Sequence, residues 1–114
     1  FMDFGTYEGS SNSIYRTTFN IFGIISLNTW YNIVAIYENN KFRIYVNGTK
    51  VSETSTADGI KTSTAPIGIG AAYIYGSFTR IFTGLINDAL IYNRDISESE
   101  ITANFNATKS KYGL

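Results

Sequence analysis

The stretch WYNIVAIYENNKFRIYVNGTKV, from Trp30 to Val51, decides the fold. It predicts three consecutive antiparallel strands: Trp30 to Tyr37, Phe42 to Val46, and a third that begins at Thr49. Asn47-Gly48 between two apolar runs is a strong hairpin signal, because a type I′ turn needs a positive φ at both central residues. The first strand is apolar on both faces, which is typical of a central strand that is covered on both sides.

Composition indicates one β-rich domain with a sizeable core. The chain has 114 residues, of which 44% are apolar and 16% aromatic. Nine basic and nine acidic residues give a formal net charge of zero. A nucleic-acid-binding protein needs a basic face, so we expect no nucleic-acid partner.

Two residue types are absent from the sequence, and their absence excludes several kinds of site. The chain contains neither cysteine nor histidine. Zinc sites built from thiolates or imidazoles, and Ser-His-Asp or Cys-His nucleophiles, are therefore excluded in their usual forms. No apolar run approaches the roughly 20 residues that a membrane-spanning helix requires, so we expect no membrane insertion.

The remainder of the chain predicts further short strands and one late helix. Pro66 opens PIGIGA, a strand punctuated by glycines, and the longest β pattern runs from Arg80 to Tyr92. Ser97 and Glu100 have the spacing of a capping box at the start of a helix, and the polar tail ATKSKYGL is expected to leave the domain. With seven or eight strands, the expected fold is all-β: an antiparallel two-sheet β-sandwich or jelly roll with one short C-terminal helix.

Five motifs in order resemble one family. These are Trp30 at a strand start, YVNG at Tyr45, PIGIG at Pro66, FTGLINDALIYNR at Phe82, and Ile-Ser-x-x-Glu-Ile at Ile96. The pattern resembles the laminin-G-like, concanavalin A-like lectin/glucanase jelly roll, in particular its bacterial and phage members. The resemblance spans residues 30 to 105 and implies a fold rather than one task, because such folds host many functions.

The resemblance also bears on domain organisation. Residues 1–114 are interpreted as a single domain that forms the C-terminal part of a longer chain. The family usually has more strands before the position of Trp30, so either these strands are missing or this is a trimmed version. If they are missing, an unpaired sheet edge is expected, which another protein chain or the rest of the parent chain would complete.

The loop from Ala71 to Arg80 is the expected binding site. It carries Tyr73, Tyr75 and Arg80, and exposed aromatic side chains on a loop suit sugar rings or protein partners. In a sugar site, Arg80 and Asn87 would bond the hydroxyls. The alternative is that the aromatic rings simply cover one end of the sandwich. For Trp30, the interpretation favoured over a sugar platform is a core aromatic at a strand start.

Asp88 is the candidate metal ligand. Some members of the resembled family bind calcium through carboxylates and carbonyls at the sheet edge. Calcium takes six to eight oxygens, and the other acids considered, Asp3, Asp58 and Asp95, are scattered along the chain. A structural hydrogen bond from Asp88 to a neighbouring loop is the alternative.

Catalysis is not expected. The glucanases of this superfamily carry alternating acidic residues on one strand, and retaining hydrolysis needs two carboxyl groups about 5 Å apart. This sequence has no such strand. We expect a non-catalytic carbohydrate-binding, lectin-like module of a secreted, cell-surface or virion protein. The alternative is a structural or protein-interaction module without a glycan ligand, as in a phage tail, a capsid decoration or an adhesin stalk.

Overall fold

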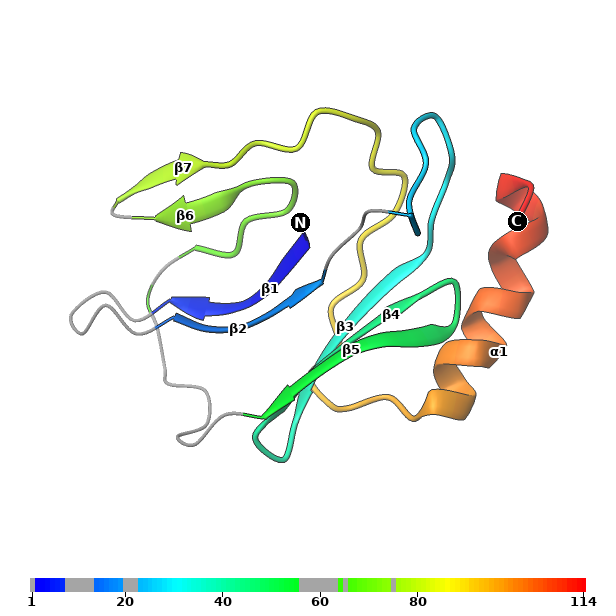
Figure 1. Cartoon of the computed structure of the whole chain (residues 1–114), viewed down its shortest axis with the longest axis horizontal. Coiled ribbons are helices and arrows are strands. Elements are labelled where there is room, and N and C mark those ends of the chain that lie inside the picture. Colours follow the sequence, from blue (N-terminus) through cyan, green and yellow to red (C-terminus); the bar gives the residue numbers. More distant parts are fainter. Residues whose placement is uncertain (1, 8–13, 20–22, 56–63, 65, 75) are drawn as a thin grey trace.

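The structure is a computed structural model that describes residues 2–7, 14–19, 23–55, 64, 66–74 and 76–114 (Figure 1). Its strands are β1 (Met2–Tyr7), β2 (Ile14–Phe19), β3 (Ile33–Glu38), β4 (Lys41–Val46), β5 (Thr49–Ser55), β6 (Ala72–Ile74) and β7 (Ser77–Thr79). One helix, α1 (Glu98–Thr108), continues into a 3₁₀ turn (Lys109–Tyr112).

The three-strand prediction for the central stretch is confirmed. β3, β4 and β5 form an antiparallel meander, and the turns have positive φ at Asn39, Asn40, Asn47 and Gly48, as tight hairpin turns require. Two details differ from the prediction. The first strand begins at Ile33 rather than Trp30, and β4 rather than β3 is the middle strand of this sheet.

The described strands do not by themselves show the two sheets of the expected sandwich. They form three separate antiparallel sheets, of two, three and two strands. The expected strands at residues 66–71 and 80–92 lie outside any described strand, with bends at residues 69–71, 80 and 84, whereas the expected loop from Ala71 contains the β6–β7 hairpin. Strand-like sequence needs a pairing partner before its backbone can form a ladder. Among the described residues, the two segments share the hydrogen bond from the Phe82 N–H to the Gly70 carbonyl, and neither is assigned as a strand.

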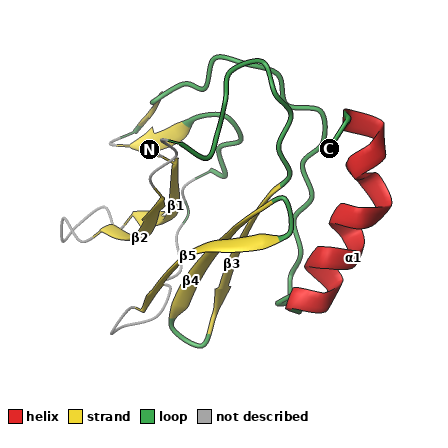
Figure 2. Ribbon diagram, turned by 45° about the vertical axis from the view of Figure 1, so that its right-hand side comes forward, coloured by secondary structure: helices red, strands yellow, loops and turns green. Residues whose placement is uncertain are grey.

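The core lies on both faces of the meander. On one face, Ile36 and Tyr45 pack with Ile96 and Ile101, which places α1 over the sheet. On the other, Ile44 and Val46 pack with Tyr31 and Val51. Val51 is the extra residue of a β-bulge in β5. Figure 2 shows the meander lying between the β1–β2 hairpin and the helix.

The helix begins as the sequence predicts. The Ser97 hydroxyl accepts from the Glu100 backbone N–H, and the Glu100 carboxylate accepts from the Ser97 N–H. Arg94 adds two hydrogen bonds to the same carboxylate, and these contacts lower the pKa of Glu100 to about 2. The capping box thus sets the residue at which the helix begins. Ile101 is fully buried, so it sets which side of the helix packs on the sheet.

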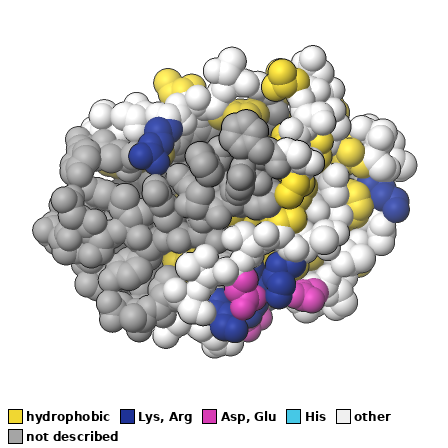
Figure 3. Space-filling view, in the orientation of Figure 1, with side chains coloured by type: hydrophobic (Ala, Val, Ile, Leu, Met, Phe, Trp, Pro, Cys, Tyr) yellow, Lys and Arg dark blue, Asp and Glu magenta, His cyan; other side chains and the backbone are white. Residues whose placement is uncertain are grey.

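A charged cluster of mixed sign covers part of the meander. Glu53 accepts hydrogen bonds from Lys50, Lys41 and Arg43, each at 3.2 Å. The bonds from the two lysines lower the pKa of Glu53 to about 2. Arg43 also pairs with Glu38 at 2.7 Å. Figure 3 shows basic and acidic side chains gathered side by side below the centre of that view.

Candidate functional site

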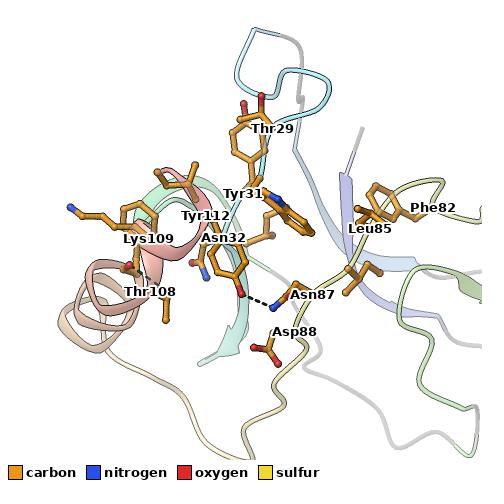
Figure 4. A pocket seen from close by; sticks show the side chains of 15 residues that line it. Thr29, Tyr31, Asn32, Phe82, Leu85, Asn87, Asp88, Thr108, Lys109 and Tyr112 are labelled. Atoms are coloured by element: carbon orange, nitrogen blue, oxygen red, sulfur yellow. Dashed lines mark hydrogen bonds between the residues drawn. The ribbon is translucent and has the colours of Figure 1, made fainter.

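A pocket of about 400 Å³ opens where three distant parts of the chain meet (Figure 4). One wall is the loop before β3, with Trp30 and Asn32. The second is the extended segment with Asn87 and Asp88, and the third is the C-terminal end of the helix, with Tyr112. The volume lies within the range of about 300–1,000 Å³ that is usual for small-ligand sites.

Trp30 stands at this pocket with part of its ring in solvent. Its side chain is 37% exposed, so the expectation of a core aromatic is wrong. The reason is local: β3 begins only at Ile33, which leaves Trp30 in the preceding loop. Its ring lies 5.5 Å from that of Tyr112, at an interplanar angle of 49°. The two rings form a tilted pair of the kind that stabilises aromatic clusters.

The loop that carries Trp30 is tied to the sheet. The Asn32 N–H donates to the side-chain oxygen of Asn47 at 2.9 Å, and the Asn32 carbonyl accepts from the Asn47 N–H at 2.8 Å. Nearby, the Ser26 N–H donates to the Tyr31 hydroxyl at 2.9 Å. Asn47 thus has two tasks, since it also makes the β4–β5 turn. These bonds fix the position of the loop that carries Trp30.

The C-terminal wall turns back toward the body of the domain. The tail was expected to leave the domain, and this is wrong: the Asn87 side-chain amide donates to the Tyr112 hydroxyl (Figure 4). Gly113 ends the 3₁₀ turn with φ of 70°, and the Leu114 N–H donates to the Lys109 carbonyl at 3.0 Å. The half-buried ring of Phe105 lies against Gly48. The end of the chain is therefore part of the pocket.

Comparison with known proteins shows the family. A family profile described as the concanavalin A-like lectin/glucanases superfamily, of laminin G type, matches residues 3–102. The chain belongs to this superfamily. Its lectin and glucanase members share a fold, so membership alone leaves the ligand open.

One solved structure is similar to this superfamily member over most of the length of the present chain. It is a 2.1 Å crystal structure of an S-layer domain-containing protein (residues 221–444) from Clostridium thermocellum, with a TM-score of 0.61 and 19% sequence identity. The match covers 90% of this chain and 50% of that one, so the chain spans about half the length of the solved structure. Among curated proteins, no sequence matches.

The structure separates the predicted binding residues of this superfamily domain into two groups. Asn87 and Asp88 line the pocket. Tyr73 and Arg80 belong to the β6–β7 region and are not among the pocket residues; the half-buried Tyr73 ring packs 5.1 Å from Phe78. Tyr75 lies outside the described residues. In the sequence, Asn87 and Asp88 were visible as a polar pair within an apolar strand pattern.

Tyr112 and Asn32 are among the pocket residues that sequence reasoning missed. Tyr112 is a single aromatic residue in a polar tail, and that isolated ring was the available signal. Asn32 is a single amide in the apolar run of the expected strand Trp30 to Tyr37, and that interruption was the available signal.

Asp88 has few potential partners as a metal ligand. It is the one acidic residue among those that line the pocket in the described chain. Within the same part of the chain, no three acidic, histidine or cysteine side chains gather as metal ligands would. Because calcium takes six to eight oxygens, this surrounding does not by itself fit the ion. Calcium at Asp88 stays a prediction.

Among the described helices, none is long and apolar enough to span a membrane.

Proposed function

We propose that this domain is a non-catalytic carbohydrate-recognition module whose binding site is the pocket around Trp30. One observation carries the proposal: the partly exposed Trp30 ring stands in a concave site together with the polar side chains of Asn87 and Asp88. The proposal therefore places the site at the helix end of the domain rather than on the loop from Ala71 to Arg80.

The chemistry of the pocket suits a sugar. The apolar face of a pyranose ring packs on an aromatic face, and its hydroxyls require donors and acceptors around the rim. Trp30 supplies the ring, Asn87 both a donor and an acceptor, and Asp88 acceptors. Leu85 and Ile86 add apolar wall between these groups. A few polar groups set in an apolar wall are the usual composition of a small-ligand site.

Binding without hydrolysis is the interpretation that the acidic residues favour. Glycoside hydrolysis uses two carboxyl groups that flank the scissile bond. Asp88 is the one acid among the described residues that line the pocket. A single carboxylate orients hydroxyls but leaves no partner for the acid and base roles, so recognition is proposed in place of turnover.

A cell-surface or secreted setting is proposed with this function. The solved structure that shares the fold comes from an S-layer domain-containing protein. The pocket is assembled from the loop before β3, the segment with Asn87 and Asp88, and the C-terminal end of the helix, and we propose that it meets polysaccharide at a surface. We propose the same class of location for this chain.

The test uses the only tryptophan of the chain as its reporter. A glycan array identifies candidate sugars, and each is then titrated while Trp30 emission is followed. Asn87→Ala is expected to weaken binding at least about tenfold, the loss of roughly one hydrogen bond to a polar ligand. Trp30→Ala, measured on the array, should abolish it. Tyr73→Ala is the matched aromatic control and should bind as the parent does.

Each outcome of this experiment decides between the sites. Loss of binding on Tyr73→Ala with full retention on Trp30→Ala would move the site to the β6–β7 region. Binding that disappears with a chelator and returns with calcium would make Asp88 a metal ligand. A folded protein that binds no glycan on the array would refute carbohydrate recognition.

A structural module is the second candidate, and a separate observation favours it. Large apolar side chains, among them Ile81 and Leu90, are mostly exposed along residues 81–92. Patches of this kind mark protein–protein contacts. Under this candidate the domain is an assembly element without a glycan ligand.

A further inference from the structure

The charged groups at the pocket bear on the kind of sugar that it would take. Two charged residues, Asp88 and Lys109, line the pocket. Asp88 is exposed, and within the described part of the chain no ion pair or hydrogen bond involves its carboxylate. This negative charge is therefore available to a ligand.

The positive charge of Lys109 is engaged elsewhere. Its Nζ atom lies 5.7 Å from the centroid of the Phe105 ring, which is the distance of a cation–π contact. Figure 4 shows the Lys109 side chain pointing away from Asn87 and Asp88. Beside Asn87, the pocket thus presents a negative rather than a positive charge.

The aromatic rings at the pocket favour a cation as well. The face of an aromatic ring attracts a positive charge, and the indole of tryptophan does so most strongly. Tyr112 already shows this attraction, because the Lys111 Nζ atom lies 5.3 Å from its ring centroid. Among the described residues, no ammonium or guanidinium group lies over the ring of Trp30, which is partly exposed. That ring can therefore accept a cation from a ligand.

We propose that the pocket selects a sugar that carries an unsubstituted, protonated amine. This inference rests on the carbohydrate proposal and adds the charge of the ligand to it. An ammonium group has three N–H donors and no acceptor, whereas the Asp88 carboxylate and the Asn87 side-chain oxygen are both acceptors. The apolar face of the same sugar packs on Trp30, which also attracts the positive charge.

Neutral and acidic sugars suit these groups less well. N-acetylation of the amine removes the charge and two of the three donors, so the charge-assisted hydrogen bonds are lost. A uronic acid would place its carboxylate near that of Asp88, where like charges repel. It would gain Lys109 as a partner only if that side chain left the Phe105 ring.

Two oligosaccharides that differ in the amine alone test the inference. Chitosan and chitin oligosaccharides of equal length are titrated at pH 6, where free amino sugars are largely protonated, while Trp30 emission is followed. Chitosan is expected to bind about tenfold more tightly, the combined effect of a charge-assisted hydrogen bond and a cation–π contact at an exposed site. Added salt should reduce this preference, because it screens exposed charges.

The outcomes separate this inference from the carbohydrate proposal. Equal affinity for the two oligosaccharides would overturn the amine preference and leave sugar recognition standing. Tighter binding of oligogalacturonate than of chitosan would overturn it in favour of an acidic sugar. A folded protein that binds none of the three, and no other glycan on the array, would refute recognition and the amine preference together.

One substitution removes the charge and keeps the shape of the side chain. Asp88→Asn is expected to lower the affinity for chitosan to that for chitin, with chitin binding changed by less than about threefold, because the amide still bonds hydroxyls. Asp95→Asn is the matched control, since Asp95 is an exposed acid that does not line the pocket. It should keep the preference for chitosan. Loss of the preference in both variants, or in neither, would show that Asp88 does not bind the amine and would refute the inference.

Discussion

Tyr45 should give the meander–helix contact a distinct sensitivity to alkaline pH. Its side chain is 2% exposed, and its hydroxyl donates to the Glu98 carboxylate at 2.9 Å. Burial first, and then this hydrogen bond, raise the pKa of Tyr45 to about 12, against an ordinary value near 10. The folded state thus keeps the proton that the unfolded state loses. The resulting stability is fully present below about pH 10 and is lost as the pH rises through about 12.

The size of the effect at pH 11 follows from the two pKa values. At that pH the unfolded phenol is mostly ionised, whereas the folded phenol is mostly protonated. The folding equilibrium therefore falls about tenfold relative to neutral pH, which corresponds to about 1.4 kcal/mol. The Tyr45→Phe variant keeps the packed ring but has no proton to lose.

Urea unfolding of the parent and of Tyr45→Phe at pH 8 and pH 11 measures this difference. At pH 8 the variant should be less stable by about 1 kcal/mol, the usual worth of one hydrogen bond. At pH 11 the gap should close or change sign, since the parent alone suffers the Tyr45 penalty. Ionisation of the other tyrosines affects both proteins alike. A gap that stays the same at both pH values would refute the reasoning.

Three further predictions concern the helix and the turn it covers. Ile101→Ala should lower the free energy of unfolding by about 3 kcal/mol, because the side chain is fully buried, whereas Asn104→Ala on the exposed side should change it by less than about 0.5 kcal/mol; denaturant melts compare them. The depressed pKa of Glu100 stabilises the fold above about pH 4.5, and this stabilisation is lost as the pH falls through about 2. Glu100→Gln should therefore lose less stability than the parent over this pH range, which thermal melts between pH 6 and pH 2 measure. Gly48→Ala should cost about 1–3 kcal/mol in a urea melt, because φ is 78° there and Phe105 lies 3.2 Å from the new Cβ; a neutral variant would contradict the assigned turn.

Local sequence signals determined the parts of the fold whose hydrogen bonds join residues close together in the chain. The Asn47-Gly48 turn and the capping box at Ser97 each bond residues a few positions apart. Their chemistry is complete within one hairpin or one helical turn, and both were correct from sequence. The family resemblance, which rested on five short motifs, is confirmed by the match over residues 3–102.

Residues 80–92 show that a local β pattern alone does not determine whether a segment forms a strand. The β pattern of this segment is strong, yet the described chain leaves it outside any strand. A strand exists only when a second backbone pairs with it, and that partner is a property of the whole assembly rather than of the segment. Leu90 and Ile91 thus carry the sequence of an inner strand and the exposure of a surface one.

The pocket could be found only from the tertiary structure. Trp30, Asn87 and Tyr112 come from a loop, an extended segment and the end of the helix, and 82 positions separate the first of them from the last. Sequence supplied the chemistry of each: an aromatic ring, an amide and a phenol. Their meeting depends on the packing of Ile101 on the meander and on the two bonds between Asn32 and Asn47. Long-range packing therefore decided where the site is, because no local pattern encodes which distant side chains share one cavity.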